Sequence, residues 1–96
     1  MNITEKLDAL KADIKKNFPD VWIKDGEAFG LGERDSLWTG EGSYMPDGRC
    51  AFDGLCLDYK EKTYRLGVHK QLITLLDQHG FYAEQHDAGT FFIRHS

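Results

Sequence analysis

The chain has 96 residues, of which 12 are Lys or Arg and 16 are Asp or Glu, so its formal net charge is -4. A chain of this length forms one domain with a single thin core, which excludes a deep cleft between domains. The apolar fraction of 41% and the charged fraction of 29% are ordinary for globular proteins and argue against disorder. We therefore expect one compact domain spanning residues 1–96.

The cellular setting is indicated by the N-terminal residues and by the cysteines. Met1 to Lys6 is polar and charged, so we expect no signal peptide, and two cysteines are too few for a disulfide scaffold of the secreted kind. No apolar run approaches the roughly 20 residues that a membrane helix requires. These features favour a cytoplasmic protein that makes no membrane contact.

The N-terminal segment has the apolar spacing of a helix. Ile3, Leu7, Leu10 and Ile14 recur at intervals of four and three, which indicates one buried helical face. Asn2, followed three residues later by Glu5, has the form of a capping box, with Thr4 as the competing cap. Phe18-Pro19 should end this helix, because the residue before a proline is pushed toward extended conformations.

The middle of the chain favours short strands. Asp25-Gly26 between residues 21–24 and 27–31 predicts a two-residue hairpin, because both turn positions of such a hairpin need positive φ. Further short strands are expected at 37–39, 49–53, 55–59 and 64–68, with Leu55 and Leu57 on a shared face.

The C-terminal third predicts a second helix followed by a hairpin. Apolar residues recur at helical spacing from Val68 to His79, and Gly80 can close the last turn in a left-handed conformation. Residues 81–85 and 90–94 are rich in aromatic and β-branched side chains and flank a loop with turn chemistry. Phe81 and Ala83 are the better core candidates, which would leave Tyr82 and Phe92 half exposed.

These elements together define the expected fold. We predict an α+β domain with a largely antiparallel sheet and two helices on one face, in the order helix, about six strands, helix, β-hairpin.

Candidate catalytic and metal-binding residues are few. Cys50, Cys56 and the four histidines lack the close pairs that metal sites use, and the two cysteines would face opposite sides of a hairpin as buried, unreactive thiols. A Cys-His pair such as Cys50 or Cys56 with His69 can be drawn in any small domain with these residues. We therefore expect no catalytic residue, no metal and no cofactor.

The negative charge is concentrated in the middle of the chain. Residues 20–58 contain nine acids against three Lys or Arg, a net charge of -6, while the flanking segments are each +1. This acidity disfavours direct nucleic-acid binding, which requires a basic stripe among the aromatic residues. Aromatic residues surrounded by acids suit instead a protein interface that attracts a basic partner.

The leading prediction is therefore a non-catalytic module that binds a protein with a basic surface. It could act as an inhibitor or regulator of a nucleic-acid-binding protein, as small acidic accessory proteins of phages and mobile elements do; this analogy rests on size and charge alone. The predicted partner-binding residues are Trp22, Asp25, Glu27, Glu33, Asp35, Trp38, Glu41, Tyr44 and Asp47.

Three alternatives remain open. The tryptophans could be core residues while the acids only keep the surface soluble. The protein could be a small-ligand or metal-assisted enzyme that uses His69, Cys50 and Cys56. It could also be a homodimeric structural subunit, in which a second copy covers the free face of the sheet around Tyr82 and Phe92.

Overall fold

The computed structural model describes residues 2–30, 34–55, 57–58 and 60–96. The elements follow the chain as α1 (Ile3–Asn17), β1 (Lys24–Asp25), η1 (Gly26–Ala28), β2 (Leu37–Gly40), β3 (Tyr64–Arg65), β4 (Val68–His69), α2 (Lys70–Gln78), β5 (Phe81–Asp87) and β6 (Thr90–His95). Among these residues, four strands form an antiparallel sheet in the order β1-β2-β6-β5, and β3 pairs with β4 in a separate ribbon. The predicted α+β class is confirmed.

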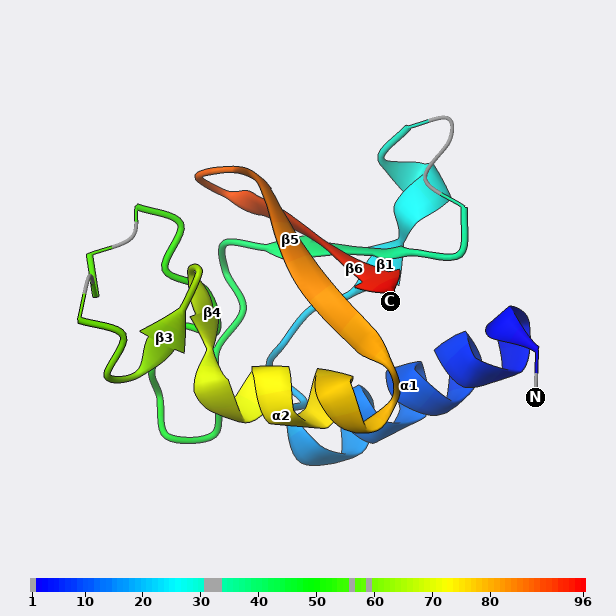
Figure 1. The fold of residues 1–96 in the computed structure, drawn as a ribbon, viewed down its shortest axis with the longest axis horizontal. Helices are drawn as coiled ribbons and strands as arrows, with labels where there is room; N and C mark the ends of the chain where they lie inside the picture. Colours follow the sequence, from blue (N-terminus) through cyan, green and yellow to red (C-terminus); the bar gives the residue numbers. More distant parts are fainter. Residues whose placement is uncertain (1, 31–33, 56, 59) are drawn as a thin grey trace.

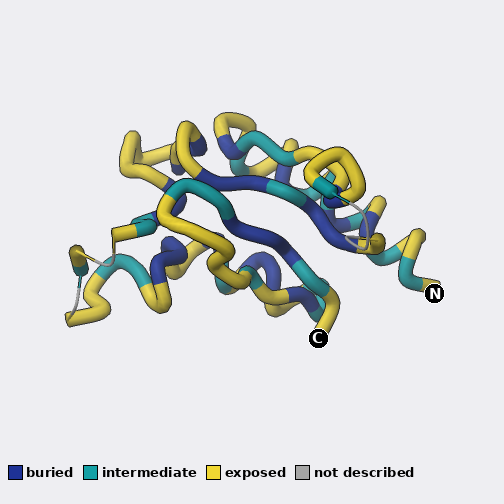
Figure 2. The backbone as a smooth tube through the Cα atoms, turned by 90° about the horizontal axis from the view of Figure 1, so that it is seen from above, coloured by how far each residue is buried: buried dark blue, intermediate teal, exposed yellow. Residues whose placement is uncertain are grey.

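Both helices lie on the same side of the four-stranded sheet, as expected (Figure 1). Leu7, Leu10 and Ile14 of α1 are buried, and they belong to the same core cluster as Leu72, Leu75 and Leu76 of α2. The sheet supplies Leu37, Phe81, Phe91 and Ile93 to this cluster. In Figure 2 the buried stretches run along the sheet, whereas most connecting turns are exposed. The core therefore lies between the helices and the inner face of the sheet.

The helix ends follow the capping rules that the sequence indicated. The Asn2 side chain accepts a hydrogen bond from the Glu5 backbone N–H over 2.9 Å, and α1 ends at Asn17, just before Phe18-Pro19. Gly80 follows α2 with a φ of +79°, in the left-handed region that glycine tolerates best. The start of α2 was predicted too early, because Val68 and His69 form β4 and His69 caps the helix.

The predicted hairpin at Asp25-Gly26 is wrong. Gly26 begins the short 3-10 helix η1, and β1 pairs with β2 instead of with residues 27–31. The Gly26 N–H donates to the Ser36 carbonyl over 2.9 Å, so a longer connection replaces the tight turn. Leu31, the last residue of the expected second strand, lies outside the described residues.

Two further expectations are corrected in the middle of the chain. Between Arg49 and Asp53 the backbone makes only isolated bridges, from Cys50 to Tyr44 and from Phe52 to Val68, rather than a strand. Leu55 and Leu57 are exposed in a loop instead of sharing the face of a strand. Around the leucines, the Asp53 carboxylate accepts a hydrogen bond from the Asp58 N–H, and the Asp58 carboxylate accepts one from the Thr63 N–H. Such side-chain bonds to the backbone favour turns over a strand ladder.

The outer face of the sheet is partly covered by the chain itself. Phe92 was expected to be half exposed, but only 1% of it is accessible. The rings of Phe29 and His86 meet it edge to face, with centroids 5.0 and 5.5 Å away, and the Arg94 guanidinium lies over it at 5.1 Å. Tyr82, on the same face, remains 41% exposed as predicted.

Candidate functional site

The acids predicted to bind a partner do not form one surface, and three of them lie beside the chain's own cations. Asp25 accepts a hydrogen bond from the Lys11 ammonium over 2.7 Å. Glu27 lies 3.6 Å from Arg34, and Asp47 lies 3.8 Å from Arg49. Exposed ion pairs of this kind contribute little stability, but each offsets negative charge that would otherwise attract a partner.

Trp22 and Trp38 are neighbours, and both are half buried. Their rings meet edge to face at 5.6 Å, and the Lys24 ammonium lies 5.8 and 5.2 Å from the two ring centroids. The Trp22 indole N–H donates to the Glu41 carbonyl over 2.8 Å. The tryptophans therefore pack under a cation of the chain, and Trp22 holds the segment that carries Glu41.

The remaining predicted residues are divided between other parts of the surface. Asp35 has a φ of +56° and lines a hollow of about 420 Å³ whose other charged groups are mainly cationic: Lys6, Arg34 and Arg94. Glu33 lies outside the described residues. Glu41 and Tyr44 lie together on a different hollow. Of the nine predicted residues, this last pair marks the more promising site.

Glu41 and Tyr44 lie at one end of a groove formed by two adjoining hollows of about 310 and 460 Å³. The hollows share Cys50, Phe52, Asp53 and Leu57. We call this surface the acidic groove and define it by these described residues: Glu41, Tyr44, Cys50, Phe52, Asp53, Leu55, Leu57, Asp58 and Tyr64.

The acidic groove combines exposed apolar side chains with carboxylates. Leu55 is 71% exposed, Leu57 74% and Tyr44 48%, which is unusual for residues so close together in a small domain. Glu41, Asp53 and Asp58 supply negative charge, and no Lys, Arg or His occurs among the described residues that line the two hollows. Chemically, this surface suits a ligand that carries both apolar groups and positive charge.

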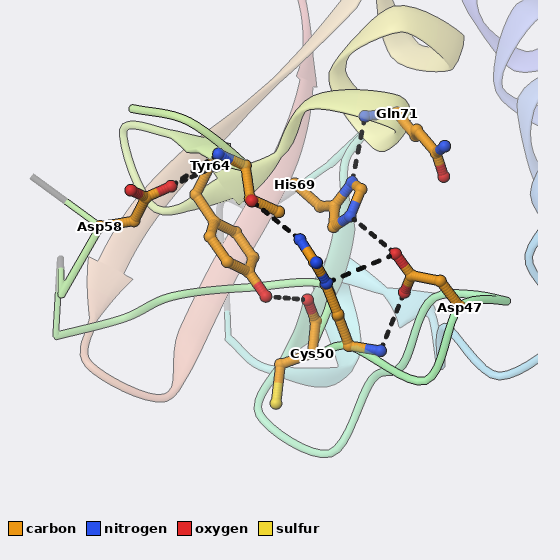
Figure 3. Close-up of polar contacts among 8 residues, drawn as sticks. Asp47, Cys50, Asp58, Tyr64, His69 and Gln71 are labelled. Atoms are coloured by element: carbon orange, nitrogen blue, oxygen red, sulfur yellow. Dashed lines mark hydrogen bonds and ion pairs between the residues drawn. The ribbon is translucent and has the colours of Figure 1, made fainter. Parts of the chain in front are cut away.

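Hydrogen bonds join the two walls of the groove (Figure 3). The Tyr64 hydroxyl donates to the Cys50 carbonyl over 2.7 Å, and Arg49 Nη1 donates to Thr63 Oγ1 over 2.9 Å. Burial raises the pKa of the Tyr64 hydroxyl, which favours the protonated form that donates this bond. The segment that carries Cys50 is therefore held against the segment that carries Thr63 and Tyr64.

Asp58 stabilises the loop that carries the exposed leucines. Its carboxylate accepts hydrogen bonds from the backbone N–H groups of Thr63 and Tyr64, over 2.7 and 2.9 Å. The bond from Tyr64, followed by that from Thr63, lowers the pKa of Asp58 below its ordinary value. The Asp58 N–H in turn donates to Asp53 Oδ2 over 2.8 Å. Asp58 therefore remains charged well below neutral pH.

His69 meets the ring of Tyr64 edge to face at 5.5 Å and caps the start of α2. Its Nδ1 accepts a hydrogen bond from the Gln71 backbone N–H over 3.1 Å, so the proton of the neutral ring is on Nε2. Nε2 faces Asp47 Oδ2 (Figure 3) at 3.7 Å, too far for a good hydrogen bond. The His69 side chain is 6% exposed. The arrangement makes His69 a buried helix cap.

Cys50 differs from the expectation of two buried thiols. Cys50 is exposed and free, its backbone forms a bridge with Tyr44, and it lines both hollows of the groove. Cys56 lies outside the described residues. No hydrogen bond joins Cys50 to His69 in the part of the chain that the structure describes, and no group of three or more His, Cys, Asp or Glu there could hold a metal ion.

Sequence reasoning missed Leu55, Leu57, Asp53 and Asp58. Leu-x-Leu was interpreted as a strand face, although Asp53-Gly54 before it and Asp58 after it are turn-forming residues. Aspartates that flank a short apolar pair were the available signal for an exposed loop.

Comparison of the chain with protein-family models, curated proteins and solved structures gave no match. In the described part of the chain, neither helix has the length and apolar content needed to cross a membrane.

Proposed function

We propose that this chain is a non-catalytic protein-binding module whose acidic groove receives a basic, apolar segment of another protein. The observation that carries the proposal is the juxtaposition of exposed Leu55 and Leu57 with three carboxylates on a surface whose described lining lacks cations. Apolar contacts supply affinity at the centre of such an interface, and the negative potential speeds encounter with a basic partner.

The proposed partner is still a protein with a basic surface, but the proposed binding site is now the acidic groove. Asp25, Glu27 and Asp47 already lie beside cations of the chain, so they contribute less to a negative field than Glu41 and Asp53. A regulator of a nucleic-acid-binding protein would work through such a groove, because the basic segment held there could not contact phosphates at the same time.

The enzyme alternative has less support. A Cys-His mechanism requires the histidine nitrogen to accept the thiol proton, but Nδ1 of His69 already accepts the bond that caps α2. Cys50 instead lines the groove and is exposed, so alkylation of its thiol would report whether the groove is occupied.

Affinity capture from a cell lysate with matched variants tests the proposal. The groove variant carries Glu41→Gln and Asp53→Asn, and the control carries Asp25→Asn and Glu27→Gln, so each loses two charges. A third variant, Leu57→Ser, removes one apolar side chain that is 74% exposed. Wild type and control should retain the same protein at low salt and release it as salt rises, and the groove and Leu57→Ser variants should retain much less.

Equal retention by all four proteins would overturn the proposal, as would capture that does not respond to salt. A captured protein that meets these criteria should protect Cys50 from alkylation when it is bound. If that partner binds nucleic acid, wild type should compete with the nucleic acid, and the groove variant should not.

A further inference from the structure

Leu66 occupies a turn position that disfavours leucine. Leu66 and Gly67 form the two-residue turn between β3 and β4, with φ of +51° and +80°. Such turns need positive φ at both positions and strongly prefer Asn-Gly, because a branched side chain is strained there. Leu66 is also 78% exposed, the highest value among the exposed large apolar residues. Neither backbone conformation nor core packing accounts for a leucine at this position, which suggests that its side chain makes a contact outside the chain.

An apolar hollow of about 250 Å³ lies beside Leu66. Its walls come from β3, β4, α2 and β5, and the apolar and aromatic residues among them are Val68, Ile73, Leu76, Phe81, Tyr82 and Ala83. β5 is an end strand of the four-stranded sheet, so the hollow adjoins an unpaired sheet edge, which faces the viewer in Figure 1. This surface is separate from the acidic groove, because the two have no described lining residue in common.

Two opposite charges lie on the rim of the same hollow. Arg65 and Asp77 both line it, and both are exposed. Within the described residues neither makes an ion pair with another part of the chain. The surface therefore carries a projecting leucine, an apolar hollow, a positive charge and a negative charge side by side. We call it the Leu66 patch.

We propose that the Leu66 patch binds the same patch of a second copy of this chain across a two-fold axis. Leu66 of each copy enters the hollow of the other, and Arg65 of each copy pairs with Asp77 of the other. A two-fold interface must be self-complementary, so that each contact occurs twice with the roles exchanged. The Leu66 patch carries both members of each contact, a projecting leucine with a hollow and a positive with a negative charge. The acidic groove would instead place carboxylates against carboxylates.

Molar mass measured by sedimentation equilibrium tests the proposal. The patch is small compared with stable interfaces, so we expect a weak dimer that forms between about 10 µM and 1 mM. Leu66→Asn removes the projecting side chain and places a residue that tolerates positive φ at the turn. This variant should be monomeric over the whole range, with a thermal midpoint at low concentration at least as high as that of wild type. Loss of association therefore cannot be attributed to misfolding.

Charge exchange supplies an independent test. Arg65→Glu alone and Asp77→Arg alone should each weaken association about tenfold, because each places like charges together. The double variant should recover association, since the pair is restored with its signs exchanged. Wild type that remains monomeric at about 1 mM would overturn the proposal. Undiminished dimerisation of Leu66→Asn, or a double variant no better than the single ones, would overturn it as well.

Discussion

The indole N–H of Trp22 donates a hydrogen bond to the backbone carbonyl of Glu41 over 2.8 Å, which links the two-tryptophan cluster to the rim of the acidic groove. The Trp22 backbone N–H donates a second hydrogen bond to the same turn, to Ser43 Oγ over 3.2 Å. Trp22 thus acts on the groove through the 40–43 turn and does not line it within the described residues.

Trp22→Phe should weaken this link while keeping an aromatic ring. We expect a loss of about 1 kcal/mol in the free energy of unfolding, the usual net value of one hydrogen bond. Urea denaturation of wild type and Trp22→Phe measures this loss. Partner capture should fall as well, because the Glu41 segment is no longer fixed. An unchanged unfolding free energy would mean that the bond contributes nothing to the turn.

Asp58 should make stability depend on pH. Its pKa is lowered in the folded chain by hydrogen bonds from the backbone N–H groups of Tyr64 and Thr63. A lowered folded pKa gives stability that is present above the unfolded value of about 4 and is lost as pH falls through the folded value. Asp58→Asn should therefore destabilise the protein at pH 7 and make little difference well below pH 4.

Carbon-detected NMR titration of the Asp58 carboxyl, with unfolding curves for wild type and Asp58→Asn across this pH range, checks the prediction. Titration of the carboxyl at the ordinary aspartate value would contradict it.

Phe29 should stabilise the outer face of the sheet more than its exposure suggests. Phe29 and Tyr82 are both 41% exposed, but only Phe29 meets other rings among the described residues, namely Trp38, His86 and Phe92. We expect Phe29→Ala to cost about 1 to 2 kcal/mol, from lost burial and edge-to-face contacts. Tyr82→Ala is the matched control and should cost less. Equal losses in urea denaturation would show that the ring contacts add nothing.

Gly54 should be required for the position of the loop that carries Leu55 and Leu57. A Cβ at Gly54 would lie 1.6 Å from the Ala88 carbonyl oxygen, whereas a Cβ at Gly30 would meet no atom within 4 Å. Gly54→Ala must therefore displace the loop or the β5–β6 turn, at a cost of about 1 to 3 kcal/mol. Gly30→Ala should change stability by no more than about 0.5 kcal/mol. Chemical denaturation measures the unfolding free energy of each variant. Similar losses in the two variants would contradict the close approach of Gly54 to the Ala88 carbonyl.

Local signals predicted the elements whose residues interact over short distances in the chain. The Asn2 cap, the end of α1 before Pro19, the glycine after α2 and the terminal hairpin each depend on residues a few positions apart. The same reasoning failed at Asp25-Gly26, because β1 pairs with β2 across a longer connection. A turn preference of a few residues is weaker than the pairing and burial that a distant strand provides.

The sequence by itself determined the α+β class, both helices and their buried faces, and the acidic character of the middle of the chain. Only the tertiary structure decided which acids remain beside exposed apolar residues, because ion pairs such as Lys11–Asp25 join residues distant in the chain. It also decided that Phe92 is covered and that Leu55, Leu57 and Leu66 project outward. The physical reason is that burial depends on which segments meet in space, and the periodicity of a short segment does not contain that information.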